Sequence, residues 1–228
     1  MSKEKSRAEE LKEKLFYNPK HASEVISQEE TDKADAFCEE YKSFLNKAKT
    51  EREAVVYVLE KAKKNGFVEF DRAKKYNAGD KVYYNNRGKS IILAVIGKKG
   101  LENGTRLSAA HIDSPRLDMK QNPLYEDTEI AYFKTHYYGG VKKYQWTAIP
   151  LSLHGVVVKR DGTKVYVNVG EDDNDPKFVV TDLLPHLAAE QMKRTLADGI
   201  RGEELNILIG SRPFKDDEAS EKVKLNIM

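Results

Sequence analysis

The residues Arg106–Pro115 contain the pair of side chains in this sequence that is best suited to chemistry. His111 follows a short apolar run, Asp113 comes two residues later, and Pro115 ends the run. In a β-strand, residues i and i+2 point to the same face, so a strand here would place the imidazole beside the carboxylate. A carboxylate commonly orients a histidine that binds a metal through its other ring nitrogen. The spacing therefore predicts that His111 is a zinc ligand of a hydrolase.

A single histidine does not make a zinc site, because such a site needs three or four ligands. The other acidic clusters lie in turn-like, highly charged surroundings and are expected to be solvated loop charge: Asp172-Asp173, Glu203-Glu204 and Asp216-Asp217-Glu218. Adjacent carboxylates on one strand face opposite sides, so they could share a metal only where the backbone turns. The residues alone leave two interpretations open, a metal ligand or a core histidine hydrogen-bonded to its neighbour.

The remaining histidines carry weaker signals. His21 follows Asn18-Pro19 and is expected in a loop, whereas His136 and His154 alternate with apolar residues and are expected on the surface or in the core of a sheet.

The composition limits the possible functions. The 228 residues include 39 basic and 37 acidic side chains. The resulting net charge of +2 shows no excess of basic residues of the kind that indicates nucleic-acid binding. The single cysteine, Cys38, cannot form an internal disulfide, and no secretory signal is apparent. No run approaches the ~18 apolar residues of a membrane helix. We therefore expect a cytoplasmic protein with no membrane partner.

Helices and strands alternate in the first part of the chain. Helices with buried apolar stripes are predicted over residues 28–45 and 50–64, the second beginning with the capping-box pattern Thr50…Glu53 and ending at Asn65-Gly66. Strands are predicted over residues 81–84, 90–97 and 106–111, and the second is apolar enough to be buried on both faces. This pattern indicates an α/β fold with His111 at the end of a strand.

The second part of the chain is rich in β-strand patterns. Residues 117–124 and 130–140 read as strands, and residues 151–169 form a hairpin around Asp161-Gly162. A helix is predicted over residues 181–197 and a last strand over 205–210. We therefore expect two domains, residues 1–115 and residues 116–228.

Four blocks of sequence resemble the M18 family of zinc metallo-aminopeptidases, the aspartyl aminopeptidase family, in its bacterial branch. They occur in the family's order: Ser108–Pro115, Tyr138–Trp146, Leu151–Val158 and Leu184–Ala188. The first is similar to the family's zinc-ligand motif and the second to its Tyr-Gly-Gly…Trp segment, with Val141 where the eukaryotic branch has a third glycine.

The resemblance implies a zinc exopeptidase-type catalytic domain that is interrupted by an inserted β-rich dimerisation domain, residues 116–228. It implies removal of N-terminal residues, acidic ones included, from peptide substrates, two zinc ions per active site, and assembly into a homo-dodecamer. His111 would bind one zinc, Asp113 would be the carboxylate that holds the site, and His186 would bind substrate in a neighbouring subunit.

The sequence departs from the family in its extent. The bridging aspartate, the paired glutamates, a further carboxylate ligand and the last histidine of the family all come later in the chain. We therefore expect residues 1–228 to be the N-terminal half of the enzyme, inactive alone. The alternative is a non-enzymatic assembly or interaction module built on the β-rich part.

Overall fold

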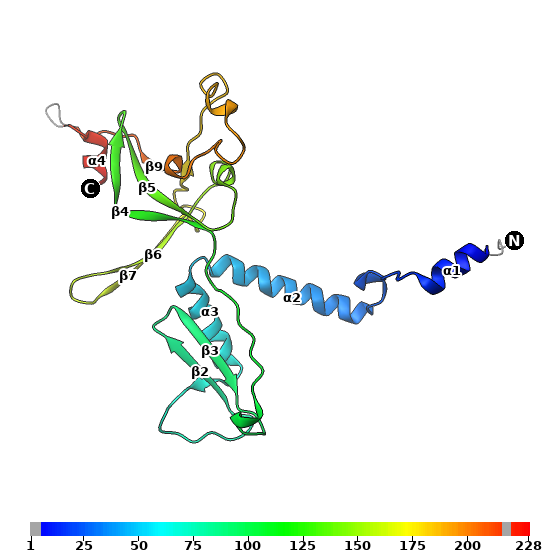
Figure 1. Ribbon diagram of the computed structural model, residues 1–228. Helices are drawn as coiled ribbons and strands as arrows, with labels where there is room; N and C mark the ends of the chain where they lie inside the picture. The colour runs from blue at the N-terminus through cyan, green and yellow to red at the C-terminus, as the bar shows by residue number, and fades with distance from the viewer. Residues whose placement is uncertain (1–5, 216–219) are drawn as a thin grey trace. The chain divides into compact units, whose positions relative to one another are not determined.

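The computed structural model of the protein describes residues 6–215 and 220–228 and has a mixed helix and strand content (Figure 1). It divides into two compact units, Met1–Lys47 and Ala48–Met228. Within the described ranges, no helix is long and apolar enough to cross a membrane. The expected mixture of helices and strands is confirmed, whereas the inserted β-rich domain and the domain boundary at residue 115 remain predictions.

The first unit contains α1 (Arg7–Leu15), the 3-10 helix η1 (Ala22–Glu24) and α2 (Gln28–Lys47). The predicted helix over 28–45 is confirmed, but α2 has no buried residue. Phe37 and Tyr41 of the predicted buried stripe are exposed. That part of the prediction was wrong for this unit, because an apolar stripe becomes buried only when another element packs against it.

The second unit begins with α3 (Glu51–Lys64), which confirms the predicted helix and its capping box. The Thr50 hydroxyl accepts from the Glu53 N–H, and the Glu53 carboxylate accepts from the Thr50 N–H. Ala54, Val55 and Ala62 form the buried face of α3. These contacts satisfy backbone donors that otherwise lack partners at a helix start.

A three-stranded sheet follows in the order β1 (Val68–Glu69), β2 (Lys81–Asn86), β3 (Ser90–Val95). β1 runs parallel and β3 antiparallel to β2. The prediction that the strand over residues 90–97, which forms as β3, is buried on both faces was wrong, since Ile92 is 61% exposed. A strand is buried on both faces only where other elements cover each face, whereas Ile92 and Leu93, which point to opposite faces of β3, are both exposed.

The strand predicted over residues 106–111 does not form. After η2 (Leu101–Asn103) the chain has no regular secondary structure until residue 116. A strand needs a neighbour for its N–H and C=O groups, and no described residue pairs with this segment. Leu107 is 88% exposed as a result.

The second sheet has the order β4 (Arg116–Asp127), β5 (Ile130–Tyr138), β9 (Ile207–Gly210), β8 (Val179–Val180). It confirms three predicted strands, and Figure 1 shows β4 and β5 as its longest pair. The core against this sheet consists of Trp146, Val180, Ile200, Leu205 and Ile207. Trp146 lies in η3 (Lys143–Thr147), so the tryptophan of the second sequence block is a core residue.

The predicted hairpin is confirmed as β6 (Leu153–Val158) and β7 (Lys164–Val169), with Gly162 in the turn at φ 85°. The helix predicted over residues 181–197 was wrong. Only η4 (Gln191–Lys193) forms there, and Leu187 is 72% exposed. Most helical stability in proteins comes from packing of the apolar face. In this segment Ala188 is buried, but Leu184 and Met192 are exposed like Leu187.

The two remaining elements are short: η5 (Gly202–Glu204), before β9, and α4 (Lys222–Ile227), after it. α4 buries Val223 and was not predicted from the sequence.

Candidate metal centre

His111 and Asp113 lie side by side at the end of the irregular segment that leads into β4. The imidazole Nδ1 of His111 is 3.1 Å from Oδ1 of Asp113 and 3.0 Å from the Asp113 carbonyl oxygen. Both oxygens can only accept, so Nδ1 carries the hydrogen. This leaves Nε2, on a side chain that is 83% exposed, available to coordinate a metal. The predicted pairing is therefore present, although it forms in an irregular segment rather than in a strand.

The second carboxylate oxygen of Asp113 accepts a 2.5 Å hydrogen bond from the hydroxyl of Tyr138, the last residue of β5. This bond lowers the pKa of Asp113 below its usual value and raises the pKa of Tyr138. The two shifts have one cause, because a donor stabilises the carboxylate, and the carboxylate disfavours an anionic phenolate. The only sequence signal for this contact is that Tyr138 begins the second of the four family-like blocks.

Arg116 lies over the ring of Tyr138, with its guanidinium carbon 4.3 Å from the ring centroid. The same guanidinium donates to the carboxylate of Asp118 at 2.7 Å and to the carbonyl of Ser114 at 3.3 Å. The stacking is a cation–π contact, and its pairing with Asp118 fixes the guanidinium plane. Arg116 thus contacts both the aspartate-bearing segment and the tyrosine.

His186, the predicted substrate-binding residue, has no hydrogen bond or ion pair with His111 or Asp113 among the described residues. It is exposed in a turn after Pro185. Its predicted role towards a neighbouring subunit is not tested by a single chain.

The adjacent acidic residues Glu203 and Glu204 each have a cationic partner. Glu203 accepts from Lys120 at 2.7 Å, and Glu204 accepts from Arg194 at 2.9 Å. The cluster at 216–218 lies outside the described residues. Within the ranges 6–215 and 220–228, no group of three or more histidine, cysteine or acidic side chains could hold a metal ion. His111 fits zinc as one ligand of a larger set.

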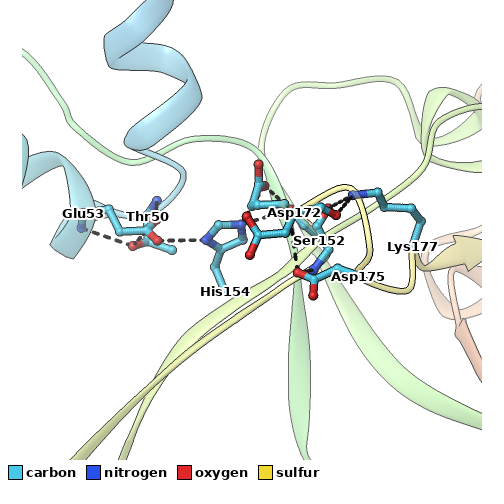
Figure 2. A network of polar contacts seen from close by, with 9 residues as sticks. Thr50, Glu53, Ser152, His154, Asp172, Asp175 and Lys177 are labelled. Carbon is cyan, nitrogen blue, oxygen red and sulfur yellow. Dashed lines mark hydrogen bonds and ion pairs between the residues drawn. The ribbon is translucent and has the colours of Figure 1, made fainter.

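His154 of β6 lies at the centre of a separate polar network that links it to α3 (Figure 2). Its Nδ1 is 2.8 Å from Oε1 of Glu53, and its Nε2 is 2.9 Å from Oε1 of Glu171. Ser152 also donates to Glu171, at 2.6 Å. The His154 side chain is only 9% exposed. Each ring nitrogen of His154 therefore faces a carboxylate oxygen, Glu53 on one side and Glu171 on the other.

The acidic loop after β7 is ordered by backbone contacts in the same network (Figure 2). Asp175 accepts from the N–H of Gly170 at 2.8 Å, which lowers the pKa of Asp175. Lys177 donates to the carbonyls of Gly170 and Asp172. These contacts present Glu171 to His154, a partnership between residues too distant for the sequence pattern to reveal.

The network predicts a specific acid sensitivity. The pKa of Glu171 is lowered from 4.5, first by the Ser152 hydroxyl and then by His154. A lowered pKa in the folded state contributes stability that is present above 4.5 and is lost as the pH falls through the lower folded value. The Glu171→Gln variant is therefore expected to lose less stability than the wild type as the pH falls from 4.5 through the lowered folded pKa of Glu171, as measured by urea unfolding followed by circular dichroism.

Glu190→Gln is the matched control, because Glu190 forms an exposed ion pair with Lys193, and such pairs contribute little. If the free energy of unfolding fell equally with decreasing pH in the wild type and in Glu171→Gln, the prediction would be contradicted.

Comparisons with known proteins place these residues in a family. The family model described as aminopeptidase I zinc metalloprotease (M18) matches residues 44–228. A probable M18 family aminopeptidase 1 of Clostridium acetobutylicum is 51% identical over 218 residues, which are 94% of this chain and 47% of that protein. One of Borrelia garinii is 48% identical over 204 residues, 89% of this chain and 44% of that protein.

Solved structures agree with the sequence comparisons. The crystal structure of the M18 aminopeptidase of Thermotoga maritima has a TM-score of 0.84 at 42% identity and covers 93% of this chain and 46% of its own. Aminopeptidase I of C. acetobutylicum has a TM-score of 0.80 at 49% identity, over 94% of this chain and 48% of its own. The chain spans about half the length of the curated relatives it matches. The chain belongs to the M18 family, the aminopeptidase I zinc metalloproteases.

Proposed function

We propose that this chain forms one wall of the active site of a zinc-dependent aminopeptidase, with Nε2 of His111 as a zinc ligand. The observation that carries the proposal is the contact of Nδ1 with Asp113, which leaves Nε2 as the ring nitrogen available to a metal on a side chain that is 83% exposed. A bound zinc ion would polarise the scissile peptide carbonyl. Asp113 acts on the ring of His111 and fixes its tautomer.

The remaining zinc ligands would come from the half of the enzyme that residues 1–228 do not span. Support comes from the relatives, which are about twice as long as the part that this chain matches. In the complete enzyme we propose two zinc ions per site, peptide substrates, acidic N-terminal residues as the preferred class, and the cytoplasm as the location. Residues 1–115 would belong to the catalytic domain, and residues 116–228 would be an inserted β-rich dimerisation domain.

We also propose that the enzyme is a homo-oligomer, up to a dodecamer, in which His186 contacts substrate bound by a neighbouring subunit. Its exposed position in a turn is compatible with such a contact. A yeast protein with the same fold, at 19% identity and a TM-score of 0.56, is described as the mApe1 dodecamer.

Purified residues 1–228 are expected to bind zinc weakly and to show no turnover of aminoacyl-nitroanilides. One ligand cannot supply the roughly 10–16 kcal/mol of a complete structural zinc site. His111→Ala should abolish the weak binding measured by isothermal titration calorimetry. His21→Ala, which removes an exposed histidine elsewhere, should leave it unchanged. Turnover by this chain, or zinc binding that survives His111→Ala, would contradict the proposal.

The second candidate is a non-enzymatic assembly module, and one observation favours it. The β6–β7 hairpin exposes several apolar side chains, Val157, Val158, Val165 and Tyr166. An isolated two-stranded hairpin is marginally stable, and exposed apolar patches mark interaction surfaces. Sedimentation velocity of wild type and Tyr166→Glu would reveal self-association through this hairpin. A stop codon directly after codon 228 would favour this candidate, whereas a continuing reading frame would favour the enzyme.

A further inference from the structure

We infer that Tyr138 is a positioning residue for the metal centre, which acts by holding Asp113 in the orientation that exposes Nε2 of His111. The inference rests on the proposed zinc role of His111. No hydrogen bond between described residues joins Tyr138 to the ligand His111, and 25 positions separate Tyr138 from Asp113.

The two oxygens of Asp113 have different partners. Oδ1 faces Nδ1 of His111 at 3.1 Å, and Oδ2 accepts from the Tyr138 hydroxyl at 2.5 Å. Rotation of the carboxylate would break both bonds together, so the tyrosine sets the plane in which Asp113 meets the imidazole. Without the hydroxyl, Asp113 has only the histidine to orient it, and its side chain is 36% exposed to competing water.

The sheet brings Tyr138 to this position. In the β4–β5 ladder Tyr138 lies opposite Arg116, three residues after Asp113. Arg116 stacks on the tyrosine ring while it donates to the Ser114 carbonyl, so both ends of the segment are tied to the same aromatic side chain. The ring is therefore fixed from its face, and the hydroxyl at its edge is directed at the carboxylate.

A second contact, made by the backbone after Tyr138, links the same two segments of the chain. Gly139 adopts φ +100°, and a Cβ on it would lie 2.7 Å from Cα of Pro115. The end of β5 is therefore packed directly against the residue that follows the His111–Ser114 segment. This close approach needs glycine and keeps the two strands in register beside the metal ligand.

Tyr138→Phe tests the inference, because it keeps the ring under Arg116 and removes only the hydroxyl. The first measurement is the tautomer of His111 in zinc-free 1–228, from long-range nitrogen–proton NMR correlations above neutral pH. Wild type should hold the hydrogen on Nδ1. Tyr138→Phe should shift the population towards the Nε2–H form of a free histidine.

The second measurement is zinc affinity, followed through the His111 resonances. Tyr138→Phe should weaken binding by roughly threefold to tenfold, less than the ~10–100-fold that follows loss of the carboxylate partner itself. In an Asp113→Ala background the same substitution should have no further effect, since the tyrosine acts only through Asp113. Tyr84→Phe removes a hydroxyl from a comparably exposed tyrosine of β2 and should change neither measurement.

The outcomes separate the two claims. A wild-type Nδ1–H tautomer that is unchanged in Tyr138→Phe, with unchanged zinc affinity, overturns the positioning role and leaves the zinc assignment standing. An Nε2–H tautomer in the wild type overturns it without any mutation. A wild type whose His111 does not respond to zinc overturns the proposed function, while the tautomer comparison still decides whether Tyr138 orients the ring.

Discussion

Replacing Trp146 with alanine is expected to lower the free energy of unfolding of this chain by about 3–5 kcal/mol, the usual cost of truncating a buried aromatic side chain. Trp146 belongs to the core cluster against the second sheet, where it lies with Val180, Leu205 and Ile207. Its removal would leave a cavity between η3 and that sheet. Urea unfolding followed by far-ultraviolet circular dichroism would measure the loss, since the chain has no other tryptophan to report by fluorescence.

Trp146→Phe separates packing from hydrogen bonding. The indole N–H of Trp146 is buried and has no hydrogen-bond partner among the described residues. Phenylalanine removes that unsatisfied donor and keeps an aromatic ring, so it should cost about 1 kcal/mol, well below the alanine variant. Leu187→Ala, at an exposed position, should be neutral. Equal losses for Trp146→Ala and Leu187→Ala would contradict the placement of Trp146 in the core.

Local sequence signals predicted the elements that depend on neighbours in the chain. The capping box of Thr50 and Glu53 and the Asp161-Gly162 turn are both present, because each is formed within a few residues. The strand over 106–111 and the helix over 181–197 are absent, although their apolar patterns were typical. Those patterns report a face that needs a partner, and the described residues provide none.

In the candidate site, too, the contact between residues close in sequence was predicted, and the contacts between distant residues were not. The contact between His111 and Asp113 spans two positions and was predicted, although from the geometry of a strand that does not form. The Tyr138 contact depends on the register of β4 with β5, which a sequence of alternating residues does not specify. The pairing of His154 with Glu53 spans 101 positions and joins a strand to a helix. No local pattern could have assigned that partner.

The second large effect is expected at Gly139, the residue that links the sheet to the metal centre. Gly139→Ala places a Cβ 2.7 Å from both Cα and Cβ of Pro115, at a φ of +100° that L-residues rarely adopt. A backbone atom cannot yield as a flexible side chain can, so the end of β5 and the segment before β4 must separate. The strained conformation alone costs about 1–3 kcal/mol, and the separation should also lengthen the bond between Tyr138 and Asp113.

Gly140→Ala is the matched control beside it. A Cβ at Gly140 meets nothing within 4 Å, and Gly140 is not among the glycines with positive φ. We therefore expect a lower urea midpoint and a His111 tautomer shifted towards Nε2–H for Gly139→Ala, and wild-type behaviour for Gly140→Ala. If both alanines behaved alike, the close contact between Gly139 and Pro115 would not be what holds the aspartate against the tyrosine. If Gly139→Ala were destabilised but kept the wild-type tautomer, the backbone contact would stabilise the sheet without orienting His111.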